Sequence, residues 1–255
     1  MRTTLPDFGS LQPLRDRRLL EAWDRASAAG DAGRASALLS AACPGTSPAQ
    51  WDAVGIPEVN LQLVRLRQIS FGSSLTGHLP CSECGAQLEF DLDVAQIIQR
   101  LETMAEDATA DWTSGNDRFS MRTVNHLDLV AVGTQARPED ARLLLLERCT
   151  QVNGGPASDE KASTALRAAE TVAVETFTRL HQAAEITCRV PCVACGHTGE
   201  TDLDIARFLW AEVRHHAGKL LREIHELASA HGWSEEAILN LPAHRRERYL
   251  EMIRS

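Results

Sequence analysis

The chain has 255 residues, of which 44% are hydrophobic and 5% aromatic, and its formal net charge at pH 7 is −9. No apolar run approaches the roughly 18 to 20 residues of a membrane-spanning helix, and the opening residues lack the apolar segment of a signal peptide. We therefore predict a cytoplasmic protein without membrane contact. The acidic charge argues against nucleic acid as a partner, because phosphate binding usually requires a basic face.

The N-terminal region, residues 1–58, is predicted to be helical after a loose leading segment. Apolar residues at helical spacing predict one helix over 14–29 and a second over 35–42. The turn between them is expected at Gly30, since glycine interrupts helices. Pro48 predicts a further helix start, because proline suits the first helical position.

Residues 59–100 are predicted to contain a helix, the first half of a metal-binding ribbon and the beginning of another helix. Leucines and valines at helical spacing predict a first helix that stops at Gly72. Its arginines, among them Arg67, are expected on a solvated face. Alternating polar and apolar residues then predict two strands, and Asp91 or Asp93 is expected to cap the following helix.

Residues 101–185 are predicted to form a helical insertion. The polar stretch 104–117 predicts a loop or a frayed segment, and the glycine-rich stretch 152–158 predicts a flexible link. Asn125 has the spacing of a helix cap. An alanine-rich stretch at 159–184 predicts the longest helix of this part.

The remaining chain is divided into a second ribbon half with a long helix, 186–232, and a C-terminal helical hairpin, 233–255. Apolar periodicity after Asp202 predicts a helix that ends at Gly232. The hairpin could be a DNA-reading unit, but glutamates balance its arginines. Packing on its own chain or docking on a partner is favoured.

The strongest signal is a pattern that occurs twice. Each copy reads Cys-x-x-Cys-Gly, then five residues, then Asp-Leu-Asp followed by an apolar residue and Ala. The second copy follows the first by a constant 111 positions (192 minus 81), which keeps cysteines, glycine and acidic stretch in register. The copies begin at Cys81 and Cys192.

A Cys-x-x-Cys-Gly turn directs two thiolates to one side, because the glycine allows the backbone to fold back. Two such turns supply four soft ligands in the tetrahedral arrangement that Zn²⁺ accepts. A site of four thiolates has no open coordination position, which favours a structural ion over a catalytic one. We predict one structural Zn²⁺ ion with the ligands Cys81, Cys84, Cys192 and Cys195.

Several alternatives to this ligand set remain open. The cysteine pairs could be redox-active or simply buried, although an odd total of seven cysteines does not suit a disulfide framework. Cys188, His78 or His197 could replace a ligand. A solvated helix face is favoured over a second metal site for four further histidines, namely His215, His216, His225 and His231.

The fold class predicted from these elements is mainly α. It is a helical scaffold around a split zinc ribbon, made of two Cys-x-x-Cys knuckles with short β-strands, and it carries a long helical insertion. No phosphate-binding loop or nucleophile elbow is recognisable, so neither an enzyme nor a small-molecule substrate is predicted. Two other function classes are kept: a zinc-ribbon module that binds nucleic acid or assists transcription, and a hydrolase whose pocket would lie in the insertion.

A further set of motifs lies around the knuckles. A helix rich in leucine and arginine, Leu61 to Arg67, precedes Phe71-Gly72, and the first knuckle continues into Leu-Glu-Phe-Asp-Leu-Asp. The middle segment contains Leu-Leu-Leu-Leu-Glu-Arg-Cys149. The chain closes with Trp-x-x-x-x-Ile-Leu-x-Leu-Pro-x-x-Arg-Arg-x-x-Tyr-Leu. Together these motifs resemble the T-even-type baseplate proteins, which are encoded with contractile phage tails and related injection systems.

The resemblance spans most of residues 59–253. It implies a structural or assembly protein of a baseplate, with other baseplate or tail proteins as partners and a place in a tail-like particle either permanently or during assembly. One departure is local: family members often have a Leu-Pro-Thr turn before the Asp-Leu of the middle segment, where this chain has Arg122-Thr-Val-Asn125.

Overall fold

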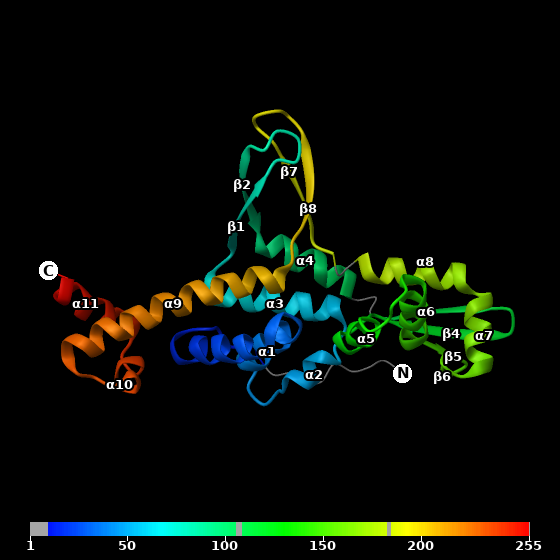
Figure 1. Cartoon of the computed structure of the whole chain (residues 1–255), viewed down its shortest axis with the longest axis horizontal. Helices are drawn as coiled ribbons and strands as arrows, with labels where there is room; N and C mark the ends of the chain where they lie inside the picture. The colour runs from blue at the N-terminus through cyan, green and yellow to red at the C-terminus, as the bar shows by residue number, and fades with distance from the viewer. Residues whose placement is uncertain (1–9, 106–108, 183–184, 255) are drawn as a thin grey trace.

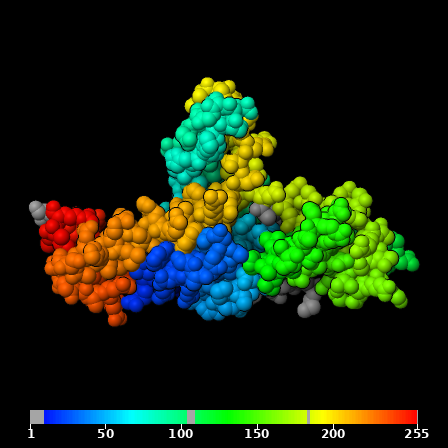
Figure 2. All heavy atoms as spheres, in the orientation of Figure 1, coloured from blue at the N-terminus to red at the C-terminus, as the bar shows by residue number. Residues whose placement is uncertain are grey.

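The computed structural model of the chain describes residues 10–105, 109–182 and 185–254, so most of the leading segment expected at 1–12 lies outside the described residues. The helices form an elongated body, a narrow arm stands out from its middle, and a lobe of helices and strands forms one end (Figure 1). The arm rises well clear of the body surface (Figure 2). The predicted mainly α scaffold around a split ribbon is confirmed.

The body is built from long and short helices that bury leucine-rich faces against one another. α1, α3 and α9 contact each other, and the leucines between them are fully buried, so the burial of apolar surface holds the body together. No helix within the described ranges has both the length and the apolar character needed to cross a membrane. The helices of the body are α1 (Asp16–Ala42), α2 (Pro48–Asp52), α3 (Ile56–Phe71), α4 (Val94–Ala105), α9 (Ile205–His231), α10 (Glu235–Leu239) and α11 (Ala243–Arg254).

α1 bends at Gly30, which has a φ of 66° and a ψ of −174°. Side chains other than glycine rarely adopt this backbone conformation. The two helices predicted at 14–29 and 35–42 therefore meet here, and their separation at a glycine is confirmed. The predicted ends of α3 at Gly72 and of α9 at Gly232 are confirmed as well.

The arm consists of two antiparallel hairpins, β1 (Ser74–Pro80) with β2 (Gln87–Asp93) and β7 (Thr187–Pro191) with β8 (Thr198–Asp202). Apolar and polar residues alternate along β1, β2 and β7, as expected for sheets with one buried face. Leu88 and Val190 belong to the small core between the hairpins. The ring of Phe90 covers Gly77, where an added Cβ would lie 2.3 Å from it.

The two hairpins belong to a larger internal repeat. α3, β1, β2 and α4 are followed 111 positions later by α8 (Glu170–His181), β7, β8 and α9, and the helices after the hairpins start at Val94 and Ile205 (205 minus 94). Asp93 accepts a hydrogen bond from the second residue of its helix at 2.9 Å, and Asp204 caps α9 at the same distance. The predicted capping role of Asp93 is thereby confirmed.

The lobe is formed by the predicted insertion and has its own core, built around Phe119 and Met121. A four-stranded antiparallel sheet lies beside the helices, so the insertion predicted to be helical also contains strands. The boundaries predicted at 101 and 185 stay a prediction. The elements are β3 (Thr109–Ser114), β4 (Asp117–Arg122), α5 (His126–Val132), α6 (Pro138–Cys149), β5 (Thr150–Val152), β6 (Gly155–Pro156), α7 (Glu160–Ala168) and α8 (Glu170–His181).

Three predictions for the lobe are wrong. The loop or frayed segment expected at 104–117 contains the end of α4 and the edge strand β3, whose polar side chains are mostly exposed, while 106–108 lie outside the described residues. The link expected at 152–158 contains a hairpin that turns at Asn153 and Gly154, both with positive φ. The helix expected at 159–184 is interrupted at Ala169, which has a φ of −101° and a ψ of 16°.

Arg67 does not lie on a solvated face as predicted. Its side chain is 5% exposed, and its guanidinium forms two hydrogen bonds with the carboxylate of Glu212 at 2.8 and 3.0 Å. A third hydrogen bond, 2.7 Å long, reaches the carbonyl oxygen of Gly72 at the end of α3. The ion pair therefore ties α3 to α9 inside the body.

We expect Arg67→Met to lower the free energy of unfolding by about 3 kcal/mol, because it leaves the carboxylate of Glu212 without its buried partner. Arg65→Met is the matched control on the same helix, since the pair that Arg65 forms with Glu102 of α4 is exposed and should contribute less than about 1 kcal/mol. Urea unfolding of both variants measures the difference. Equal losses of unfolding free energy in the two variants would contradict the assignment of Arg67–Glu212 as a stabilising buried pair.

Candidate metal centre

The four predicted ligands lie at the end of the arm, where each hairpin turns. In both turns a glycine adopts a left-handed conformation, with φ of 72° at Gly85 and 74° at Gly196. Their N–H groups donate to the carbonyl oxygens of Cys81 and Cys192 at 2.9 and 2.8 Å. The local sequence thus builds the same knuckle twice, because the glycine permits the reversal that a larger residue would oppose.

The hairpins bring the two knuckles together, as predicted. The ligand atoms of all four cysteines lie within 4.8 Å of one another. The sulfurs of Cys81 and Cys195 are 3.8 Å apart, and those of Cys84 and Cys192 are 3.7 Å apart. A tetrahedron with metal–sulfur bonds of about 2.3 Å has edges of about 3.8 Å. The four thiols therefore fit a tetrahedral metal ion.

The chemistry of the thiols also suits a cation. The backbone N–H groups of Cys84 and Glu83 lower the pKa of Cys81, and those of Cys195 and Ala194 lower the pKa of Cys192 to about 7. The N–H of His197 acts to lower the pKa of Cys195, but the neighbouring thiols Cys192 and Cys84 outweigh it and raise this pKa to about 12. Four thiolates so close together require a positive charge between them.

The alternative ligands do not join the site. Cys188 is buried in the core at the base of the arm, and neither His78 nor His197 belongs to the cluster. Within the described residues no other group of three or more metal-ligating side chains is found. Of the histidines on α9, His216 stacks on Phe71, with ring centroids 4.6 Å apart, while the others remain exposed.

Comparisons with protein-family models, with curated proteins and with solved structures find no match for this chain.

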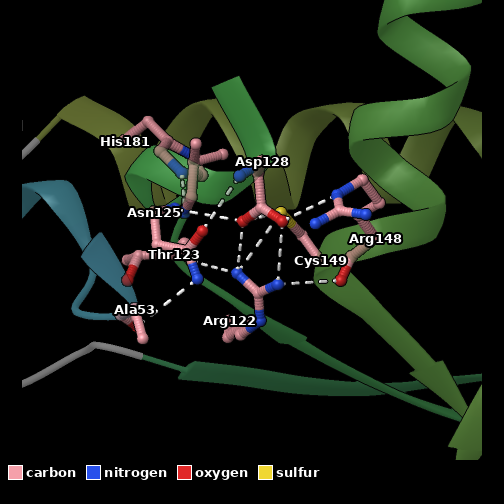
Figure 3. Close-up of polar contacts among 9 residues, drawn as sticks. Ala53, Arg122, Thr123, Asn125, Asp128, Arg148, Cys149 and His181 are labelled. Carbon is pink, nitrogen blue, oxygen red and sulfur yellow. Dashed lines mark hydrogen bonds and ion pairs between the residues drawn. The ribbon is translucent and has the colours of Figure 1, made fainter. Parts of the chain in front are cut away.

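A second polar cluster, which sequence reasoning missed, lies where the lobe joins the body (Figure 3). Its centre is Asp128, whose side chain is fully buried on α5. Arg122 donates to its carboxylate at 2.6 and 3.1 Å, and Arg148 donates at 2.9 Å. The backbone N–H of Asn125 donates to the same carboxylate at 3.1 Å, and the thiol of Cys149 donates at 3.8 Å. The available signal was the capping pattern at Asn125, which is confirmed.

The same cluster connects the lobe to the segment between α2 and α3. The side chain of Asn125 donates to the carbonyl oxygen of Ala53 at 3.3 Å, and the two segments form a β-bridge at Gly55. His181 accepts a hydrogen bond from the N–H of Val124 at 2.8 Å. Burial lowers the pKa of His181, which favours the neutral ring that can accept this bond. The sequence departure at 122–125 therefore lies at the junction of lobe and body.

The thiol of Cys149 lies beside Asp128 but does not resemble a nucleophile. Burial is the main cause that raises its pKa to about 12. A buried thiol with a raised pKa is protonated at neutral pH and therefore unreactive. Cys149 and Cys43 are both buried core residues.

A groove of about 500 Å³ lies on the body, between the start of α1, the end of α3, α9 and α11. Arg246 lines it from α11 and forms an ion pair with Asp16 as well as a 2.7 Å hydrogen bond to the carbonyl oxygen of Leu241. The hydroxyl of Ser70 accepts a hydrogen bond from the N–H of Leu14 at 2.9 Å. The C-terminal hairpin thus packs on its own chain, and the groove lies outside the lobe in which a hydrolase pocket was considered.

We expect Cys84→Ser to lose most of its bound metal, because the remaining three thiolates make a weaker site. Both hairpins should loosen together, since each depends on the same ion. Cys188→Ala is the matched control and should keep its metal. Metal analysis per chain and hydrogen exchange of β1–β2 and β7–β8 measure the outcome, and a full metal equivalent in Cys84→Ser would contradict the shared site.

A pH dependence follows from Asp128. Burial by itself would raise its pKa, but hydrogen bonds from Arg122, Asn125 and Arg148 outweigh burial and hold the pKa below the ordinary 3.8. The ionised carboxylate therefore stabilises the fold above pH 3.8, and this contribution is lost as the pH falls through the lowered pKa. Asp128→Asn should cost about 3 kcal/mol at pH 7 and progressively less in acid.

Urea unfolding of the wild type and Asp128→Asn across this pH range tests the expectation. Asp140→Asn is the control, because the Arg137–Asp140 pair is exposed and should contribute little. A difference between wild type and Asp128→Asn that does not shrink in acid would contradict the assigned ion pairs.

Proposed function

We propose that the chain is a zinc-stabilised structural or assembly protein of the baseplate of a contractile tail or injection system, acting through contacts with other tail proteins. The observation that carries the proposal is the four-thiol cluster at the end of the arm. The two knuckles that form it are the strongest of the motifs by which the sequence resembles the baseplate family.

Zinc is the metal that this donor set favours. Four thiolates in a closed tetrahedron are typical of structural Zn²⁺ sites, and Zn²⁺ has no geometric preference that would oppose the arrangement. Such an ion leaves no coordination position for a substrate. Its contribution is to fold and rigidity, because it joins two hairpins that otherwise contact each other through a small core.

The shape of the molecule agrees with a role in binding other proteins. A narrow arm and a separate lobe extend from the body in different directions, so several faces are available to partners at once (Figure 2). Some apolar side chains are exposed on these parts. Val193, in the second knuckle, is 98% exposed, and Val130 on α5 is 54% exposed. Exposed apolar side chains at projecting positions suit protein interfaces.

Nucleic acid is disfavoured because the arm is acidic. Of its charged side chains most are carboxylates, and its Arg189 is already paired with Glu200 at 2.8 Å. A zinc ribbon that binds phosphates would need a basic surface there.

The proposal is tested by removing the gene from the native host and examining tail-like particles by electron microscopy. We expect contractile particles to be absent or to lack baseplates, and expression of the wild-type chain to restore them. Cys84→Ser should restore them less well than Cys188→Ala. Normal particles in the deletion strain, or tight and salt-dependent binding of the purified chain to DNA or RNA, would overturn the proposal.

A further inference from the structure

The two hairpins of the arm are not joined to each other or to any other strand by a β-ladder within the described residues, so each has two outer edges. An unpaired edge presents backbone N–H and C=O groups that can accept another strand. The register decides which residues supply them. In an antiparallel pair of strands, residue pairs that are hydrogen-bonded to each other alternate with pairs that are not. Cys81 donates its N–H to the carbonyl oxygen of Ala86, so the next pair in the register, Pro80 with Gln87, is not hydrogen-bonded. By the same alternation four residues of β2 direct their backbone groups away from β1, namely Gln87, Glu89, Asp91 and Asp93.

The four edges are not equivalent. Pro80 in β1 and Pro191 in β7 occupy matching positions of the repeat, and the same alternation places both on outward-facing positions. Proline has no N–H and interrupts any added strand, so the outer edges of β1 and β7 are blocked near the knuckles. β2 and β8 contain no proline. Their outer edges therefore keep every backbone donor.

The side chains of β2 indicate what kind of strand fits its edge. Glu89, Asp91 and Asp93 are exposed and alternate with Leu88, Phe90 and Leu92, which are buried or half-buried. None of the three carboxylates has a cationic partner among the described residues. A neighbouring strand would place its own side chains beside them on both faces, where opposite charges and apolar pairs are favourable.

β8 is less suited to such a neighbour. It is shorter than β2, and its Glu200 is already paired with Arg189 across the hairpin. Gly199 and Thr201 stand where β2 has Leu88 and Phe90. An added strand would bury less apolar surface there.

We propose that the outer edge of β2 binds an extended segment of a partner protein in which Lys or Arg residues alternate with apolar residues. The segment adds a third strand to the β1–β2 hairpin. Its cationic side chains lie beside Glu89, Asp91 and Asp93, and its backbone bonds to the free N–H and C=O groups of β2. The proposal rests on the proposed function only for the identity of the partner as another tail protein, because the surface itself is defined by the chain.

The probe is a synthetic peptide of the length of β2 in which lysine alternates with valine and threonine, and the control peptide has the same composition with its lysines grouped. Binding to the metal-loaded full chain is measured by fluorescence polarisation. Hydrogen exchange of individual amides is followed by NMR. We expect the alternating peptide to bind more tightly than the grouped one. The amides of Glu89 and Asp91 should slow on the order of tenfold or more, since they gain hydrogen bonds.

Two substitutions at Glu89 distinguish the contribution of side-chain charge to binding from that of backbone hydrogen bonds. Glu89→Gln should weaken binding by about two- to fivefold, as expected for one cross-strand pair, and Glu89→Pro should weaken it by about tenfold or more, because it removes an outward N–H as Pro80 does in β1. Glu200→Gln and Glu200→Pro are the matched controls 111 positions later and should bind normally. Metal content and circular dichroism verify that each variant is folded.

Equal affinity for the two peptides, unchanged exchange at Glu89 and Asp91, or equal losses in the Glu89 and Glu200 variants would overturn the proposal. If Glu89→Pro fails to retain metal, the exchange measurement on the wild type and the Glu89→Gln variant still decide the question. Failure of these peptide experiments would leave the baseplate proposal standing, because the deletion experiment tests that separately.

Discussion

The arrangement of four thiols at the end of the arm is the constraint on which the rest of the structure depends. The closest sulfur pairs join residues 108 and 114 positions apart in the sequence. An ion bound there would close a loop that contains the whole lobe, and metal clips that close long loops gain the most stabilisation in theory. The arm would otherwise rely on a small apolar core between two hairpins, which by themselves are marginally stable in water.

The repeat explains how one chain builds this arrangement. Each unit supplies a helix, a hairpin with one knuckle and a second helix, and the two units meet so that each first cysteine approaches the second cysteine of the other knuckle. Equivalent sulfur distances of 3.8 and 3.7 Å are what two similar units related by an approximate two-fold axis would give. The units then diverge away from the knuckles. α3 and α9 join the body core, whereas α8 joins the lobe, so similar elements serve different surroundings.

Buried ions form the second organising feature. The Arg67–Glu212 pair joins α3 to α9 within the body, and Asp128 with its two arginines holds α5 at the junction with the lobe. On α5 the usual pattern is reversed, because Asp128 is its buried residue while Leu127 and Val130 are exposed. Charges that are removed from water are tolerated only with well-placed partners. Both clusters therefore fix particular geometries, at points where apolar contacts alone would allow helices to slide.

The sequence by itself determined the features that depend on a few neighbouring residues. The knuckles, the helix ends at Gly72 and Gly232 and the caps at Asp93 and Asn125 follow from local backbone preferences, and the constant interval between copies predicted that the cysteines would meet. The turn at Asn153-Gly154, where we predicted a flexible link, could also have been predicted, since two residues that tolerate positive φ favour a tight hairpin. Only the tertiary structure decided the environment of Arg67 and Asp128, because their partners are distant in sequence or lie on another element. It also decided that polar residues near 109–114 form an edge strand, since pairing with β4 supplies hydrogen bonds that no local pattern encodes.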